Sequence, residues 1–320
     1  MAKTKFPVDR GLTARMLTTV FLLGLFYAIL VAALAIFVKS LAIVIIIPLG
    51  LMFAQYYASD KIALWSMHAK IVTEEQAPQL HAVIDRLCAL ADMPKPRVAI
   101  ADADMPNAFA TGRNQSHAVV CVTTGILRRL NEQELGAVLA HELSHVAHRD
   151  VAVMTIASFL GILAGFITRM LLWSDMFGGI GGGRGGRGGG RGNQGGGQLI
   201  LIEFAALAFS ALFYLISFML IRALSRYREL AADRSGAILI GQPRLLATAL
   251  QKVTGDIGNI PTRDLRTAQN FNAFFFAPAF TKGKSGASVS SLFATHPPLE
   301  VRLEQLAKLE AQMSSASRAG

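Results

Sequence analysis

The sequence predicts a mostly α-helical membrane protein with four transmembrane helices and an α+β domain that contains a small sheet. Only 16% of the 320 residues are charged, and the mean hydropathy is +0.44, values typical of a chain with several apolar runs. Four such runs occur in two pairs, and each pair is followed by a stretch of ordinary soluble composition. Short β-branched segments in the first soluble stretch predict the sheet.

Residues 1–58 are predicted to form a transmembrane hairpin. Met16–Val38 has no charged residue and is long enough to span a bilayer, and Leu41–Tyr57 is a second uncharged run. The first run is too long for a cleaved signal peptide and has no clear cleavage site. Basic residues before the first run predict that the N-terminus is cytoplasmic. They are Lys3, Lys5, Arg10 and Arg15.

Residues 151–221 are predicted to form a second transmembrane hairpin. Its two apolar runs each contain one charged residue, Arg169 in 151–173 and Glu203 in 199–221. These residues lie at similar depth, and an isolated charge in lipid is costly, so the sequence predicts an ion pair between them. In the alternative interpretation, both side chains extend to the membrane interface.

The loop at 174–198, which joins these two runs, is rich in glycine and arginine and is predicted to be flexible. Four spans return the chain to its starting side. Residues 59–150 and 222–320 would therefore form one cytoplasmic domain from two parts of the chain, in a multi-pass protein of the plasma membrane.

Cys88 and Cys121 have apolar neighbours and are predicted to be buried thiols. The net charge of +10 is explained by basic residues beside the apolar runs, so no nucleic-acid partner is expected.

Within the first soluble part, Gln76–Met93 has the spacing of an amphipathic helix. Arg97–Ala101 and Ala118–Thr123 are β-branched runs that predict strands, and Asn107–Gly112 is a candidate third strand. The candidate catalytic residues lie later in the same part of the chain.

A helix is predicted to begin at Asn131, with Glu134 in its acidic first turn, and to continue to about residue 149. It contains His141 and His145, which lie four residues apart and so project from one face. This spacing allows two imidazoles to bind one Zn²⁺. Glu142 lies beside them and would take a proton from a water that the metal acidifies.

A catalytic zinc site usually has a third protein ligand. His148 is rejected because the pattern in which a distant histidine completes the site requires glycine at 148 and histidine at 151, where this chain has Val151. Glu229 is instead predicted to be the third ligand, with Asp233, four residues later, orienting a ligand histidine. In the alternative interpretation, Glu229 is a solvated charge on a helix.

The whole pattern resembles the HtpX family of membrane zinc endopeptidases, bacterial relatives of the CAAX prenyl proteases. The resemblance covers nearly the whole chain in the expected order. It includes the paired N-terminal runs and four motifs, Asn107–Gly112, His141–His145, Glu229–Asp233 and Thr295–Glu300. It implies a zincin-like catalytic domain, one Zn²⁺ per chain, and cytoplasmic cleavage of damaged or misassembled membrane proteins. The Gly/Arg-rich loop departs from the compact pattern of the family.

Two further segments are candidate parts of the site. An exposed strand at Asn107, Ala108, Phe109 and Ala110 would pair with an extended protein substrate, although an ordinary loop or internal strand is the alternative. His296 would stabilise the oxyanion formed at the scissile carbonyl. In the alternative interpretation, it makes a local hydrogen bond at the start of the C-terminal helix.

Three other functions stay open at this point. An intramembrane protease would place the histidine motif inside a span and add a Leu-Asp-Gly motif, which this sequence lacks. A prenyl-protein processing protease shares the chemistry, so only a substrate assay separates it. A catalytically inactive membrane scaffold would have no need of Glu142, which is intact.

Overall fold

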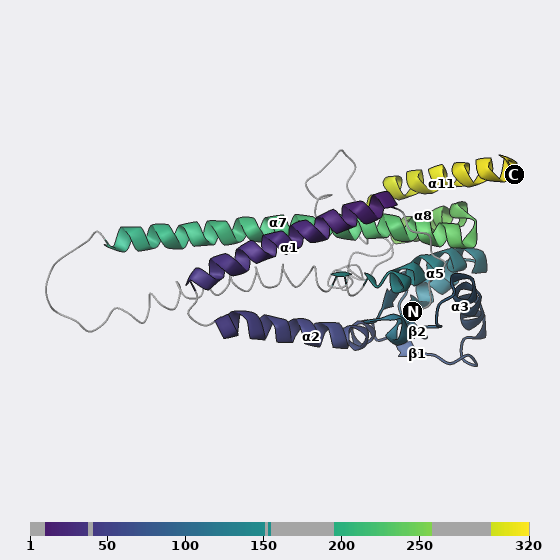
Figure 1. Cartoon of the computed structure of the whole chain (residues 1–320). Helices are drawn as coiled ribbons and strands as arrows, with labels where there is room; N and C mark the ends of the chain where they lie inside the picture. Colours follow the sequence, from purple (N-terminus) through teal and green to yellow (C-terminus); the bar gives the residue numbers. More distant parts are fainter. Residues whose placement is uncertain (1–9, 38–40, 151–152, 155–194, 258–295, 320) are drawn as a thin grey trace.

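Three long helices extend in the same direction from an end at which the sheet and the shorter helices pack (Figure 1). The computed structural model describes residues 10–37, 41–150, 153–154, 195–257 and 296–319. The long helices are α1 (Arg10–Phe37), α2 (Leu41–Ser66) and α7 (Gly195–Ile240). Helix α1 packs along α7.

The sheet has four strands, which are β1 (Lys70–Ile71), β2 (Arg97–Ala101), β3 (Ala108–Thr111) and β4 (Val119–Thr123). Their order is β1-β2-β4-β3, with β2 and β4 parallel and both outer pairs antiparallel. The three predicted strands are confirmed, and β3 forms an edge of the sheet. Strand β1 was not predicted because two residues are too short for a recognisable pattern.

Both faces of the sheet are covered, because successive residues of a strand point to opposite sides. One face joins the main core, which contains α3 (Pro78–Ala91) and α5 (Glu132–Ala147). The other face packs against the end of α2 around Ala63. The sheet residues on this face are Ala99, Ala101, Phe109, Val119 and Cys121.

The C-terminal part of the chain folds onto the same core. Leu246, Leu250 and Leu306 are fully buried there. The remaining elements are the 3₁₀ helix η1 (Gln115–His117), α4 (Thr124–Arg129), α8 (Pro243–Ile257) and α11 (Leu299–Ala319). Helices α8 and α11 pack against each other, and both contact α7.

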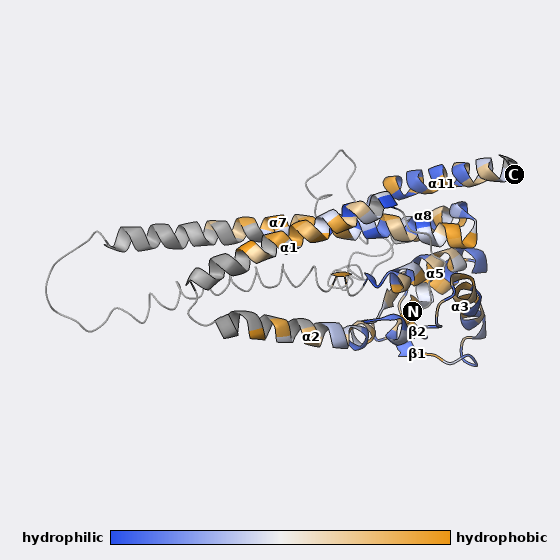
Figure 2. Cartoon of the chain, in the orientation of Figure 1, coloured by the Kyte–Doolittle hydropathy of each residue, from blue (hydrophilic) through white to orange (hydrophobic). Residues whose placement is uncertain are grey.

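Hydrophobic residues are frequent on the coloured stretches of α1, α2 and α7 that extend away from the sheet (Figure 2). Large apolar side chains on all three helices are exposed, among them Phe21 (68%), Trp65 (80%) and Leu212 (55%). No helix in the described ranges has both the length and the apolar character needed to cross a membrane. The predicted ion pair of Arg169 with Glu203 is not tested, because Arg169, like most of 151–194, lies outside the described residues.

Helix α7 departs from the predicted division of the chain. It begins at Gly195, inside the predicted loop, and continues for 46 residues to Ile240. The predicted boundary between residues 221 and 222 therefore falls inside one helix. The helix with the histidine motif is also two residues shorter than predicted, since it ends at Ala147.

Candidate active site

Helix α5 carries the histidine motif through the centre of the core. The predicted cap at Asn131 is confirmed: its side chain accepts a hydrogen bond from the backbone of Glu134, whose carboxylate accepts one from the backbone of Asn131. Such a capping box satisfies two backbone donors at the start of the helix. His141 and Glu142 are almost completely buried, at 1% and 4% exposed.

Helix α7 crosses α5 with backbone almost against backbone. A Cβ atom at Gly236 would lie 2.8 Å from the backbone nitrogen of His141 and 2.9 Å from its Cα atom. Only glycine permits this approach. Glu229, Asp233 and Gly236 have helical i, i+4, i+7 spacing and so share the face of α7 that meets α5.

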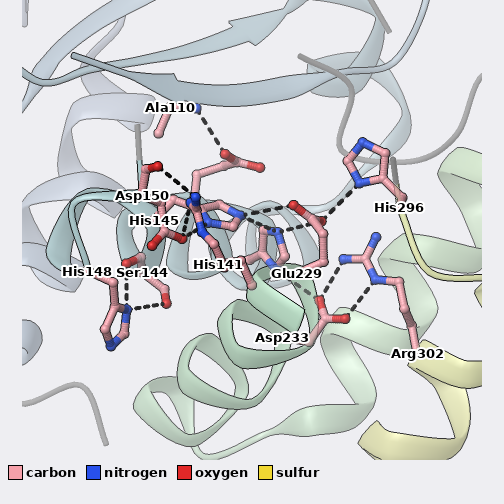
Figure 3. A network of polar contacts seen from close by, with 12 residues as sticks. Ala110, His141, Ser144, His145, His148, Asp150, Glu229, Asp233, His296 and Arg302 are labelled. Atoms are coloured by element: carbon pink, nitrogen blue, oxygen red, sulfur yellow. Dashed lines mark hydrogen bonds and ion pairs between the residues drawn. The ribbon is translucent and has the colours of Figure 1, made fainter. Parts of the chain in front are cut away.

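Three groups from these two helices converge on one point (Figure 3). The Nε2 atoms of His141 and His145 are 3.2 Å apart. The Glu229 carboxylate lies 3.7 Å from the first, through Oε2, and 3.5 Å from the second, through Oε1. Ligands about 2.0–2.1 Å from a tetrahedral zinc ion are separated from one another by about 3.3 Å. The donor set and its spacing therefore fit zinc.

His148 does not join this group. Its Nδ1 atom lies 2.8 Å from the carbonyl oxygen of Ser144, one turn back in the chain, and its ring points away from the cluster (Figure 3). His148 is therefore not part of the cluster formed by His141, His145 and Glu229.

Glu142 lies between the histidine cluster and the edge strand of the sheet. Its Oε2 atom accepts a hydrogen bond of 2.9 Å from the backbone N–H of Ala110 in β3. This N–H therefore points away from β4, toward the free edge of the sheet. The side chains of Asn107, Ala108 and Phe109 are buried, so what β3 offers at this edge is backbone.

Residues 74–310 match the family model described as peptidase family M48. The chain belongs to this family. It is 53% identical over 318 residues to protease HtpX homolog 1 of Streptomyces coelicolor, with 99% of each chain covered. It is 49% identical over 313 residues to protease HtpX homolog 2 of Methanosarcina mazei, with 98% of this chain and 100% of that one covered. The protein is a metalloprotease, as the sequence predicted.

A solved structure supports the fold. The crystal structure of S. mikatae Ste24p aligns with a TM-score of 0.54 at 19% identity, over 92% of this chain and 65% of that one. The M48 fold here is thus mostly helical with a small mixed sheet, as Figure 1 shows.

The His141 nitrogen that faces away from the cluster lies against a buried carboxylate in this M48 protein. His141 Nδ1 is 2.9 Å from Asp233 Oδ1. Asp233 in turn accepts two hydrogen bonds from Arg302, of 2.7 Å from Nε and 2.6 Å from Nη2. Arg302 is 1% exposed and comes from α11, so the C-terminal helix reaches the site. Asp233 is predicted from the sequence, whereas Arg302, whose partner is 69 residues away, is not.

His145 has a similar environment, which is not predicted from the sequence. Its Nδ1 atom lies 2.5 Å from Asp150 Oδ2, and Arg228 Nη2 lies 2.6 Å from the same oxygen. Asp150 follows the end of α5 and has no motif of its own. A signal was available, because it is the first acidic residue after the histidine motif.

His296 lies on the Glu229 side of the cluster (Figure 3). Its Nδ1 atom is 3.0 Å from Glu229 Oε2, and the side chain is 7% exposed. The contact joins residues far apart in the chain. His296 Nε2 is buried and has no hydrogen-bond partner within the described ranges.

Burial shapes the electrostatics of the site. It lowers the pKa of His145 to about 4 and also lowers the pKa of His141. Both rings are therefore neutral near pH 7, the form that binds a metal. Burial raises the pKa of Glu142 well above its ordinary value, and the nearby Glu229 carboxylate adds to this. A carboxylate with a raised pKa is a stronger base than an exposed one.

Proposed function

We propose that this metalloprotease is a zinc-dependent endopeptidase of the plasma membrane that cleaves damaged or misfolded membrane proteins on the cytoplasmic side. The observation that carries the proposal is the convergence of His141, His145 and Glu229 beside Glu142. Two imidazoles and one carboxylate are a ligand set of catalytic zinc sites that leave one position open.

His141, His145 and Glu229 would hold the zinc ion, which when bound acidifies a water and polarises the scissile carbonyl. Glu142 is the proposed general base. Its carboxylate is oriented by the Ala110 N–H, and its raised pKa favours removal of a proton from the water. Glu142 then passes this proton to the leaving amine of the substrate.

We propose that the substrate binds as an extra strand along β3. This strand is the edge of the sheet, and the Ala110 N–H already points away from β4. The backbone of Ala108 and the carbonyl of Ala110 would hydrogen-bond to an extended peptide while the Ala110 N–H stays on Glu142, and the buried Asn107 and Phe109 would fix the strand from behind. Recognition through backbone explains how misfolded proteins of different sequence would be accepted.

His296 is the proposed oxyanion donor. Its Nδ1 atom faces Glu229, and its buried Nε2 atom lacks a partner within the described ranges. A donor aimed at developing negative charge lowers the barrier of the reaction. His296→Gln is expected to lower kcat by about 10²-fold or more with little change in KM. Unchanged kcat in a variant with normal zinc content would refute the role.

The proposed membrane arrangement has four spans. It includes a hairpin in residues 1–58, a second in 151–221, and a catalytic domain built from 59–150 and 222–320. The exposed apolar side chains of α1, α2 and α7 support contact with a lipid bilayer, because large apolar patches are costly in water. The loop at 174–198 would lie opposite the catalytic side. Labelling of that loop from the outside only would agree with this topology, whereas labelling from the cytoplasm only would contradict it.

The decisive experiment compares the full-length protein with Glu142→Gln. Zinc content is measured first, followed by cleavage of casein and of an unfolded membrane protein. Glu142→Gln is expected to keep zinc and to lose about 10²- to 10⁴-fold in kcat. Glu132→Gln, on the exposed start of the same helix, is the matched control and should retain activity. Equal activity of Glu142→Gln and wild type would reject the mechanism.

Addition of a prenylated peptide to the same assay separates the two remaining functions. A prenyl-protein processing protease would cleave a prenylated peptide in preference to unfolded protein. An inactive scaffold would bind zinc and cleave neither.

A further inference from the structure

We infer that Asp150 is a positioning residue for His145 and that Arg228 holds it in place. The inference rests on the proposed zinc site. Asp150 Oδ2 lies 2.5 Å from His145 Nδ1, on the opposite side of the ring from the Nε2 atom that faces Glu229 (Figure 3). A neutral imidazole carries its proton on one nitrogen only. A carboxylate at Nδ1 holds the proton there and leaves the Nε2 lone pair directed at the metal position.

The backbone turns sharply to bring Asp150 to this place. Helix α5 ends at Ala147, and Arg149 has a left-handed φ of 56°. A left-handed conformation is costly for a residue with a side chain, so the surrounding contacts must hold it. The turn directs the Asp150 side chain back to the last turn of α5, where it is 4% exposed. A helix that simply continued would carry residue 150 away from His145, because residues five apart lie on different faces.

Arg228 holds Asp150 through two contacts. Its Nη2 atom lies 2.6 Å from the Asp150 carboxylate, and its Nη1 atom donates a hydrogen bond of 2.6 Å to the Asp150 backbone oxygen. Arg228 is itself 5% exposed, so the pair is buried and its charges compensate each other. Arg228 directly precedes Glu229 in α7. One helix therefore supplies a proposed metal ligand and also the residue that holds the carboxylate behind another ligand.

The arrangement repeats the one at the other histidine. His141 is backed by Asp233, which is held by Arg302, as His145 is backed by Asp150, which is held by Arg228. The two carboxylates come from different places, Asp150 from the turn after α5 and Asp233 from α7, and the two arginines come from α7 and α11. Two independent sets of contacts with the same chemistry indicate a common task, which is to orient the ligand ring.

A purely structural ion pair between the end of α5 and α7 is the competing explanation. Both explanations predict that loss of Asp150 lowers stability. Only the positioning role predicts weaker and altered metal binding in a protein that still folds. The chain offers a matched control in Asp60, whose carboxylate lies 2.7 Å from Arg97 and which contacts neither histidine.

The test uses the full-length metal-free protein as wild type, Asp150→Asn, Asp150→Ala and Asp60→Asn. Zinc affinity is measured by chelator competition, the visible spectrum is recorded with bound Co²⁺, and unfolding is followed without metal. Asp150→Ala is expected to bind zinc about 10- to 100-fold more weakly, with a changed Co²⁺ spectrum. The isosteric Asp150→Asn should fall between it and wild type, and should serve if the alanine variant does not fold. Asp60→Asn should bind both metals like wild type.

Wild-type zinc affinity and an unchanged Co²⁺ spectrum in the folded Asp150 variants would overturn the inference while leaving the proposed function intact. Equal weakening in Asp60→Asn would also overturn it, since the effect would then reflect general destabilisation. If the wild-type protein itself binds no zinc, or if Glu142→Gln is fully active, the proposed function fails.

Discussion

Replacement of Gly236 by alanine is expected to separate the two helices that carry the proposed metal ligands. The added Cβ atom would meet the backbone of His141 at 2.8 Å and 2.9 Å and the carbonyl carbon of Ala140 at 3.0 Å. Ordinary contacts of a Cβ atom begin at 3.4 Å. All three opposing atoms belong to the backbone of buried helix α5, so no side chain can rotate away. The helices themselves must move.

The effect on metal binding should exceed the effect on folding. Overpacking of a core costs about 1–3 kcal/mol, whereas alanine is favoured over glycine inside a helix by about 1 kcal/mol. The net loss of unfolding free energy is therefore about 0–2 kcal/mol. A functional site tolerates displacements of only about 0.5 Å, and Glu229 moves with α7 while the histidines stay on α5. Removal of a residue that orients a metal ligand weakens metal binding by about 10- to 100-fold. We expect Gly236→Ala to lower zinc affinity by at least this factor.

Gly136→Ala is the matched control, because it lies on α5 itself. Its Cβ atom would meet Val83 at 3.7 Å and Arg86 at 4.0 Å, both ordinary side-chain contacts. It should gain up to about 1 kcal/mol in stability and bind zinc normally. Chelator competition and denaturant unfolding of both variants provide the measurements. If Gly236→Ala binds zinc as tightly as Gly136→Ala, the close crossing of α5 and α7 does not set the ligand geometry.

Three further predictions follow from local features. Asn131→Ala removes the cap of α5 and should lower the unfolding free energy by about 1 kcal/mol in denaturant titrations, and an unchanged midpoint would contradict this. Burial raises the pKa of Cys88 to about 11 and of Cys121 to about 12, so at pH 8 both are protonated. Iodoacetamide should therefore modify them much more slowly in the native than in the unfolded protein, and equal rates would show that the thiols are accessible. Removal of zinc by a chelator should lower the Tm reversibly, by an amount equivalent to about 4 kcal/mol if free zinc had been 1,000 times its Kd. A Tm that is independent of zinc would argue against a bound ion.

The features predicted correctly from the sequence are those encoded within a few residues. The cap at Asn131, the β-branched strands and the helical spacing of His141 with His145 each depend on neighbours in the chain. Family membership was predictable for a similar reason, since its motifs are short and occur in a set order. Asp233 could be named because it stands one helical turn after Glu229.

The features missed depend on contacts between distant segments. Arg302 reaches Asp233 across 69 residues, and Arg228 reaches Asp150 across 78. Neither arginine has a spacing that marks it, because the partner is brought close only by the packing of α5, α7 and α11. Gly236 was missed for the same reason. A glycine inside a helix carries no local indication that a second backbone approaches it.

Helix α7 joins the apolar part of the molecule to the proposed metal site without a break. The predicted boundary at 221 and 222 treated the apolar run and the Glu229 segment as separate parts, but an uninterrupted helix offers no hinge between them. Helix α1 reinforces the connection. Its Leu23 is buried against Leu224, and the guanidinium of Arg15 lies 6.0 Å from the centre of the Tyr227 ring, two residues before Glu229. A displacement of the apolar helices would therefore move Arg228 and Glu229 together, and the environment of His145 would change at both of its nitrogens.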